Sequence, residues 1–141
     1  MSKEPLETAR YCMEHDPFAR HLGTEIVEIR PGYAKTRLKL NDNLLNFVKI
    51  PHGAVVFAVA DQAFAAAANS RGNVAVALNV SITFLAAAGP GATLVAEAEE
   101  VSCGGRTASY QIMVRDEKGK VIATFQGLVY RKDTPLETLV K

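Results

Sequence analysis

Asp61 is an acidic residue inside a run of almost wholly apolar residues, 55–68, that is rich in alanine. The alanine content and length of this run favour a helix, and a helix that is apolar on all sides is normally buried. A carboxylate in a buried helix has lost its hydration, which is costly unless something compensates. Asp61 is therefore a candidate for acid–base or nucleophilic chemistry. Two structural interpretations compete: Asp61 and Gln62 form a solvent-facing stripe, or Asp61 pairs with a buried arginine.

The rest of the chain predicts a sheet that surrounds this helix. Pro31-Gly32 separates two alternating segments, and later turn signals separate four more β segments. An amphipathic helix at about 4–15 stops before Pro17, and the polar tail at about 132–141 is expected to be loose. We predict one α+β domain, 1–141, with an antiparallel sheet wrapped around a central helix. The expected strands are 23–30, 33–40, 74–88 with a bend, 93–101, 106–115 and 121–131.

The composition narrows the classes of partner and the compartment. The chain has 16 Lys and Arg against 15 Asp and Glu, so nucleic acid or an acidic membrane is not expected as its main partner. Cys12 and Cys103 have neither metal-ligand nor redox spacing, so we expect reduced thiols, no metal and no cofactor. The first residues lack an apolar segment, which predicts no signal peptide and a cytoplasmic protein. The apolar helix is short for a bilayer.

Three linked motifs surround the helix: Asn46-x5-His52-Gly53, Phe57-x3-Asp61-x2-Phe64 and Asn69-Ser70-x-Gly72. Together they resemble the hotdog-fold acyl-CoA thioesterases of the PaaI-like (phenylacetate-degradation) branch. The resemblance covers about residues 17–131 and implies a hotdog fold. One departure concerns the family's His-Gly-Gly, because the second glycine is Ala54 here. Alanine keeps the backbone N–H, so the departure affects pocket width more than chemistry. Weaker matches are Gly105-Arg106, Tyr110, Asp116-x2-Gly119 and Gly127-x2-Tyr130-Arg131.

The chemistry of thioester hydrolysis assigns roles to these residues. Negative charge develops on the carbonyl oxygen, and donors fixed in advance at that oxygen are usually the largest catalytic contribution. N–H groups at a helix start are free and lie at the positive end of the helix dipole. We therefore expect the Gly53 N–H to be the oxyanion donor, as the resemblance also implies, and Asn46 to contact the thioester or the water. Asp61 is either the general base or a nucleophile that forms an anhydride.

His52 is a catalytic candidate with a competing structural interpretation. A histidine beside a helix start more often caps or positions the helix than acts as an acid. His52 and Asp61 are nine residues apart, which places them on opposite faces of a helix. This geometry argues against a His–Asp dyad and against a metal held by the two residues.

Candidates for substrate binding are less specific. Phe47, Phe57 and Phe64 are expected to be mostly core, with one of them lining an acyl pocket. The phosphates of a nucleotide would need cations. Taken singly, Arg106, Arg71, Arg131 and Lys132 are expected to be solvated surface, and together they are the candidates.

Helix geometry also predicts an assembly. Gly53 and Asp61 are eight residues apart, roughly 12 Å along a helix axis. One thioester carbon must lie near both groups, which a single helix serves poorly. A symmetric dimer with two antiparallel helices would bring Gly53 of one chain to Asp61 of the other. The resemblance implies the same homodimers, often paired into homotetramers.

The leading hypothesis is a thioesterase that acts on aryl-CoA, of the phenylacetyl type, or on medium-chain acyl-CoA. The second is a non-catalytic acyl-CoA sensor, and the presence of Asn46, Gly53 and Asp61 together argues against it. The third is a hotdog dehydratase for hydroxyacyl thioesters, in which His52 would have to act as the acid–base group. The acyl group, and CoA versus a carrier protein, stay open.

Overall fold

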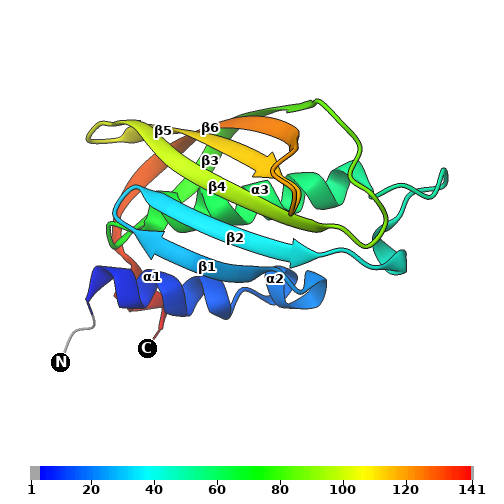
Figure 1. The fold of residues 1–141 in the computed structure, drawn as a ribbon. Coiled ribbons are helices and arrows are strands. Elements are labelled where there is room, and N and C mark those ends of the chain that lie inside the picture. Colours follow the sequence, from blue (N-terminus) through cyan, green and yellow to red (C-terminus); the bar gives the residue numbers. More distant parts are fainter. Residues whose placement is uncertain (1–3, 141) are drawn as a thin grey trace.

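Helix α3 (Gly53–Asn69) lies in the hollow of a curved sheet of six antiparallel strands, as Figure 1 shows. The computed structural model describes residues 4–140, and the expectations for residues 1–3 and 141 fall outside that range. The sheet order is β1-β2-β4-β5-β6-β3. The α+β architecture expected from the sequence is confirmed. The strands are β1 (Glu25–Arg30), β2 (Tyr33–Lys39), β3 (Asn73–Phe84), β4 (Thr93–Cys103), β5 (Thr107–Arg115) and β6 (Val121–Pro135).

The core lies between α3 and the concave face of the sheet. Alternate residues of the strands point to this face, because successive side chains of a strand point to opposite sides. In β5 the buried set is Ala108, Tyr110, Ile112 and Val114. The buried hydroxyl of Thr36 in β2 donates to the Val59 carbonyl of α3 at 2.8 Å, which ties helix and sheet together. Within residues 4–140, no helix is both long and apolar enough to cross a membrane.

Phe64 and Gly127 fix the distance between α3 and β6. A β-carbon on Gly127 would lie 2.4 Å from Cζ of Phe64, far inside any normal contact. The ring of Phe64 therefore takes the place that a side chain would occupy on β6. It also packs edge-on against Tyr110, at 5.8 Å between ring centroids.

Two short helices precede the sheet, where the sequence predicts only one. Helix α1 (Pro5–Glu14) stands in the region expected to be helical, and α2 (Pro17–Leu22) follows it. Asp16 caps α2, because its Oδ1 accepts from the backbone N–H groups of Phe18 and Ala19 at 3.0 and 3.1 Å. Pro17 occupies the first turn, where its missing N–H has no cost. The proline interpreted as a stop signal therefore begins a second helix.

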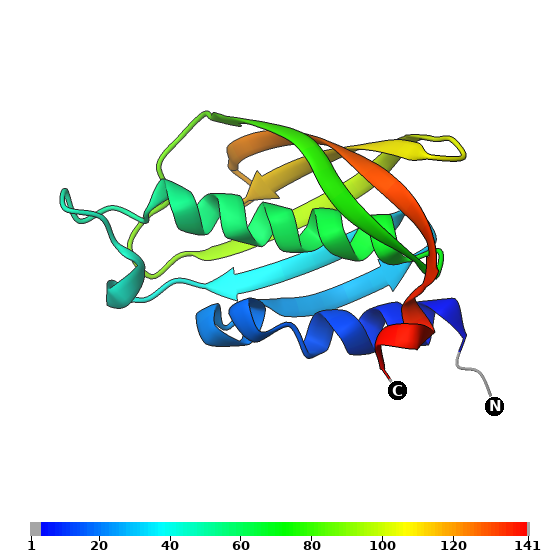
Figure 2. The ribbon, with the colours of Figure 1, turned by 180° about the vertical axis from the view of Figure 1, so that it is seen from behind.

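The junction between α1 and α2 packs against the middle of α3. Gln62 is buried, and its side-chain amide donates to the Met13 carbonyl at 3.3 Å. In Figure 2, α1 and α2 run along the β1 side of the molecule. The junction therefore lies next to Gln62, which follows Asp61 in the sequence.

The C-terminal segment differs from the loose tail expected at about 132–141. Strand β6 continues to Pro135, and a 3-10 helix, η2 (Leu136–Leu139), follows it. Leu136 is only 2% exposed, and its N–H donates to the Gly72 carbonyl at 2.8 Å. One buried leucine and this hydrogen bond hold the segment against the turn between α3 and β3. The expectation for 132–140 is therefore wrong.

Strand β3 forms one edge of the sheet and is shorter than the predicted segment 74–88. It bends through register shifts between Asn73 and Ala75 and between Ala77 and Asn79. One edge of β3 pairs with β6, and no strand within residues 4–140 pairs with the other edge. Large apolar side chains near this edge are exposed: Val76, Leu78, Phe84 and Leu85. An unpaired, apolar edge strand is a surface on which another chain can pair.

Candidate active site

The first turn of α3 leaves one backbone amide free. His52 is the N-cap, and its Nδ1 accepts from the Ala54 N–H at 3.0 Å. The N–H groups of Val55 and Val56 point to the His52 carbonyl at 3.0 and 3.3 Å. The Gly53 N–H has no hydrogen-bond partner among residues 4–140. An unpaired amide at the positive end of a 17-residue helix is suited to stabilise an oxyanion.

His52 occupies the structural position that the sequence analysis weighed against a catalytic one. Because Nδ1 accepts the Ala54 N–H, the cap uses the lone pair of Nδ1 and leaves Nε2 as the ring's donor. The cap also fixes the orientation of the first turn, and hence the direction of the Gly53 N–H. His52 thus caps the helix in this chain, and its catalytic role stays a prediction.

Asn46 organises the loop before α3. Its Oδ1 accepts from the N–H groups of Val48 and Ile50, at 3.0 and 3.3 Å. Because these bonds fix the oxygen, the opposite side of the amide carries the NH2 group, which has no protein partner within residues 4–140. Lys49 adopts a left-handed conformation, φ 64°, which closes the loop. Asn46 therefore carries an unused donor in the loop before α3, and its contact with the thioester or the water stays a prediction.

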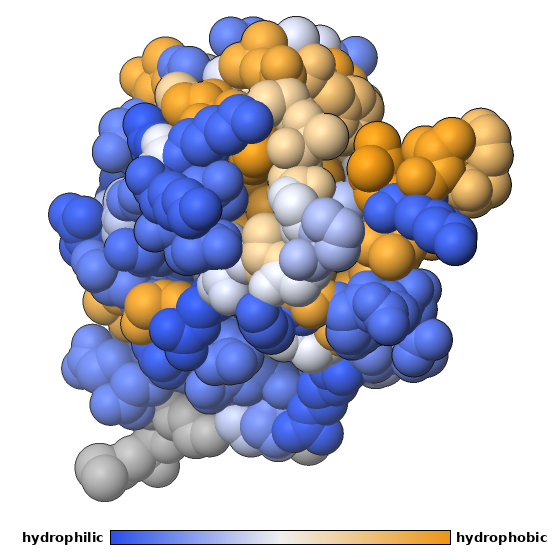
Figure 3. Space-filling model, turned by 45° about the vertical axis from the view of Figure 1, so that its right-hand side comes forward, coloured by the Kyte–Doolittle hydropathy of each residue, from blue (hydrophilic) through white to orange (hydrophobic). Residues whose placement is uncertain are grey.

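The tip of this loop is apolar and projects from the body of the protein, as Figure 3 shows. Phe47 is 95% exposed, and Val48 and Ile50 are exposed as well. The ring of Phe47 therefore stands almost wholly in solvent in the single chain. Its predicted contact with a substrate stays a prediction.

Asp61 is half-buried in the middle of α3. Burial raises the pKa of its carboxyl group, and the negative charge of Asp16 raises that pKa further. Its carboxylate makes no hydrogen bond or ion pair with any residue in the range 4–140. In this chain no described arginine pairs with Asp61, and Gln62 is buried rather than solvent-facing. The pairing with a buried arginine is therefore not found among residues 4–140, and the partly exposed stripe of α3 includes Asp61 but not Gln62.

One face of α3 is open. Residues that are not fully buried recur every three or four positions: Gly53, Ala54, Phe57, Ala58, Asp61 and Ala65. The face is lined mainly by small side chains, which allow another helix to approach closely. Gly53 and Asp61 both belong to it, but their eight-residue separation leaves roughly 12 Å between them. One chain does not bring the two groups to a common atom.

The other predicted binding residues lie in different surroundings. Phe57 is half-buried against Phe125, with 5.2 Å between ring centroids. Phe64 is 2% exposed and fills the core above Gly127, as the expectation that it is mostly core stated, and its contact with an acyl group stays a prediction. Arg106 is exposed in the β4–β5 hairpin. This hairpin lies at the end of the molecule that holds the C-terminus of α3, where the Gly32 N–H donates to the Ser70 hydroxyl. Arg106 is therefore remote from Gly53 of the same chain.

Two residues near the site were missed by sequence reasoning. The role of Asp16 was missed because the segment before Pro17 predicted only the end of a helix, and not the N-cap of a second one. Phe84 ends β3, and its ring lies against Gly53, 3.3 Å from the place that a β-carbon on this glycine would take. A phenylalanine in a β-rich segment carries no sequence signal of such a contact.

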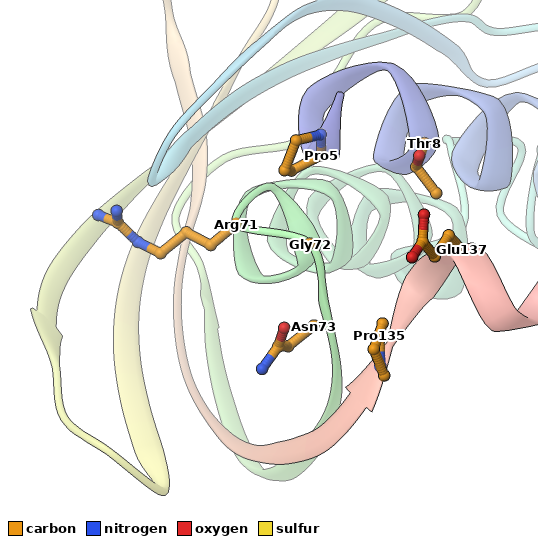
Figure 4. A pocket seen from close by; sticks show the side chains of 7 residues that line it. All are labelled: Pro5, Thr8, Arg71, Gly72, Asn73, Pro135 and Glu137. Carbon is orange, nitrogen blue, oxygen red and sulfur yellow. The ribbon is translucent and has the colours of Figure 1, made fainter. Parts of the chain in front are cut away.

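A surface hollow lies away from Gly53 and Asp61. This hollow, shown in Figure 4, is about 290 Å³ and lies where α1, the turn after α3 and the end of β6 meet. Its lining includes Arg71 and Gly72, next to the C-terminal end of α3, so it contains neither Gly53 nor Asp61. Arg71 is already bound to Glu100, with 2.7 Å between nitrogen and oxygen. No group of three or more potential metal ligands occurs within residues 4–140.

A curved antiparallel sheet wrapped around one central helix is the architecture of the hotdog fold. The chain belongs to the thioesterase superfamily, whose family profile matches residues 49–123. It is similar to the acyl-coenzyme A thioesterase PaaI of Escherichia coli, with 34% identity over 93% of this chain and 94% of the relative.

Solved structures agree with this assignment. PaaI from the phenylacetic acid degradation operon of E. coli matches with a TM-score of 0.88 and 32% identity, over 94% of this chain and 99% of that chain. A mutant of the phenylacetic acid degradation protein PaaI from Thermus thermophilus matches with a TM-score of 0.80 and 38% identity, over 83% and 100%. The chain is thus a PaaI-like hotdog thioesterase.

Proposed function

We propose that the protein hydrolyses acyl-CoA thioesters to a free acid and CoA, without a metal or an added cofactor. The observation that carries this proposal is the pair of unsatisfied groups on α3: the free Gly53 N–H and the half-buried, unpaired carboxylate of Asp61. The name of the E. coli relative supports CoA as the thiol. The phenylacetic acid degradation names of two similar structures support aryl acyl groups, with medium-chain acyl groups as the second choice.

The proposed chemistry assigns one step to each group. The thioester carbonyl oxygen accepts a hydrogen bond from Gly53 N–H, which stabilises the negative charge formed on that oxygen. The Asn46 NH2 group donates to the same oxygen or holds the water. Asp61 takes a proton from the attacking water, or attacks the carbonyl carbon itself to form an anhydride that water then cleaves. In both routes the carbon–sulfur bond breaks, and the CoA thiolate leaves and takes up a proton.

We also propose that the working unit is a homodimer, paired into a homotetramer, with each site shared between two chains. Three observations support this: the open, small-residue face of α3, the unpaired apolar edge of β3, and the distance between Gly53 and Asp61. Two antiparallel α3 helices related by a two-fold axis would place Gly53 of one chain opposite Asp61 of the partner subunit. Light scattering tests the assembly, and an active monomer of 15.2 kDa would contradict it.

The activity is tested with purified protein, a panel of aryl and straight-chain acyl-CoAs, and a thiol reagent that follows free CoA. Release of CoA that a chelator does not reduce is the expected result. Absence of turnover across the panel would refute the function. Loss of activity with a chelator, restored by zinc, would refute the metal-free chemistry.

A further inference from the structure

Phe84 lies directly beside the proposed oxyanion donor. Three ring carbons of Phe84 stand 3.3, 3.4 and 3.9 Å from the position that a β-carbon of Gly53 would take. The ring therefore covers the α-carbon of Gly53 and uses the space left by the missing side chain. Any group bound to the Gly53 N–H must also lie close to this ring.

The backbone holds Phe84 in this place. It is the last residue of β3 and pairs with Ala123 of β6. The next two N–H groups, of Leu85 and Ala86, both point to the Ile122 carbonyl, at 2.8 and 3.2 Å. Two successive N–H groups that share one carbonyl thus fix the backbone at the end of β3. The Phe84 ring lies against the start of α3.

The surface of Phe84 is not used by the core. Val80 and Ile82, on the same face of β3, are partly buried and pack against the core, whereas Phe84 is 54% exposed. A large apolar surface next to an unpaired amide has the chemical character of a binding site for an apolar group with a carbonyl. This combination is what an acyl thioester presents.

We propose that Phe84 forms a wall of the acyl-binding site and favours aromatic acyl groups over straight-chain ones. The inference rests on the proposed acyl-CoA thioesterase function. When the thioester carbonyl binds Gly53 N–H, the first carbons of the acyl group come within reach of the ring. An aryl group one methylene away can pack against Phe84 in an offset or edge-on arrangement, which a flexible alkyl chain cannot match.

The test compares Phe84→Leu with the wild type on phenylacetyl-CoA and hexanoyl-CoA. Leucine keeps an apolar side chain but removes the aromatic face. We expect kcat/KM for phenylacetyl-CoA to fall about tenfold and that for hexanoyl-CoA to change less than about twofold, within the range for apolar specificity pockets. The control is Val101→Ala, a change at an exposed apolar residue of β4 away from this edge, which should leave the ratio of the two substrates unaltered.

Each outcome decides between explanations. An equal loss for both substrates in Phe84→Leu would overturn the inference, because the ring would then act on the helix start or on CoA. A change of ratio accompanied by loss of the assembled state in light scattering would also overturn it, because Phe84 would then be an interface residue. A wild-type protein inactive on both substrates and on the wider panel would refute the proposed function, and the inference with it. Activity with an unchanged ratio would refute the inference alone.

Discussion

Asp16 acts on Asp61 through space, because its negative charge raises the pKa of the Asp61 carboxyl group. Burial of Asp61 is the larger cause of the raised pKa, and Asp16 is the second. Asp16 also caps α2, so one residue both starts a helix and places a charge near the candidate base. A general base works only when ionised, so a raised pKa moves the onset of activity to higher pH.

Asp16→Asn is therefore expected to move the acid limb of the kcat–pH profile to lower pH. Asparagine is as good an N-cap as aspartate, so α2 should persist while the charge is lost. The measurement is kcat against pH from about 4 to 8. Glu14→Gln is the control, because Glu14 is a nearby exposed acid paired with Arg10 and is not among the causes that raise the pKa of Asp61. An acid limb that stays in place with Asp16→Asn would contradict the account.

Asp61→Asn is expected to lower kcat by at least about 100-fold, the usual effect of losing a general base. The fold should be kept, because the two side chains are nearly the same size. A circular dichroism spectrum like that of the wild type, with activity lost, is the expected pair of results. Near-normal kcat would return Asp61 to a structural role.

The same substitution should raise stability at neutral pH. The folded-state pKa of Asp61 is raised, so the folded chain binds more protons than the unfolded chain between the unfolded and folded pKa values. Stability therefore falls as pH rises through that window, and Asp61→Asn removes this loss. Thermal unfolding should show a higher Tm for Asp61→Asn at pH 7, and the difference should disappear below the unfolded pKa of about 3.9. A lower Tm at pH 7 would show that the charge has a stabilising partner.

Gly127→Ala is expected to destabilise the protein by about 1–3 kcal/mol, because the new methyl group would overlap the Phe64 ring. Adding Phe64→Leu should recover part of the loss, since the smaller side chain makes room. Urea unfolding measures both variants, with Gly105→Ala, where no atom lies within 4 Å, as the neutral control. Additive losses in the double variant would show that the two residues are not coupled.

Two substitutions of His52 distinguish a capping role from an acid–base role. His52→Asn keeps a capping side chain and should retain most of the activity and stability, whereas His52→Ala should cost about 1 kcal/mol of stability. Kinetics and urea unfolding of both variants provide the comparison. Equal and near-complete loss of activity in both, with normal stability, would make His52 an acid–base residue.

The central helix was predictable because it depends on local pattern. The apolar run around Asp61 predicts a buried helix, and the structure has one there, from Gly53 to Asn69. The strand alternation predicts the sheet but not the order in which its strands pair. Gly53 could be chosen in advance because its lack of a side chain is a property of the residue alone.

The missed features depend on contacts between distant segments. The sequence places Phe64 mostly in the core but does not name its partner, Gly127, whose missing side chain on another strand leaves room for the ring. The order of the C-terminal segment depends on Leu136 meeting the turn after α3. The charge effect of Asp16 on Asp61 and the contact of Phe84 with Gly53 likewise join residues far apart in sequence, which no local pattern encodes.

The central claim is that each active site takes Asn46 and Gly53 from one chain and Asp61 from the partner subunit. The most direct measurement mixes inactive Asp61→Asn protein with inactive Asn46→Ala protein and lets the subunits exchange. A mixed dimer then carries both lesions in one site and none in the other. With random pairing, about a quarter of the wild-type activity should return. No recovery after verified exchange would contradict the shared site, because every site would then keep one lesion.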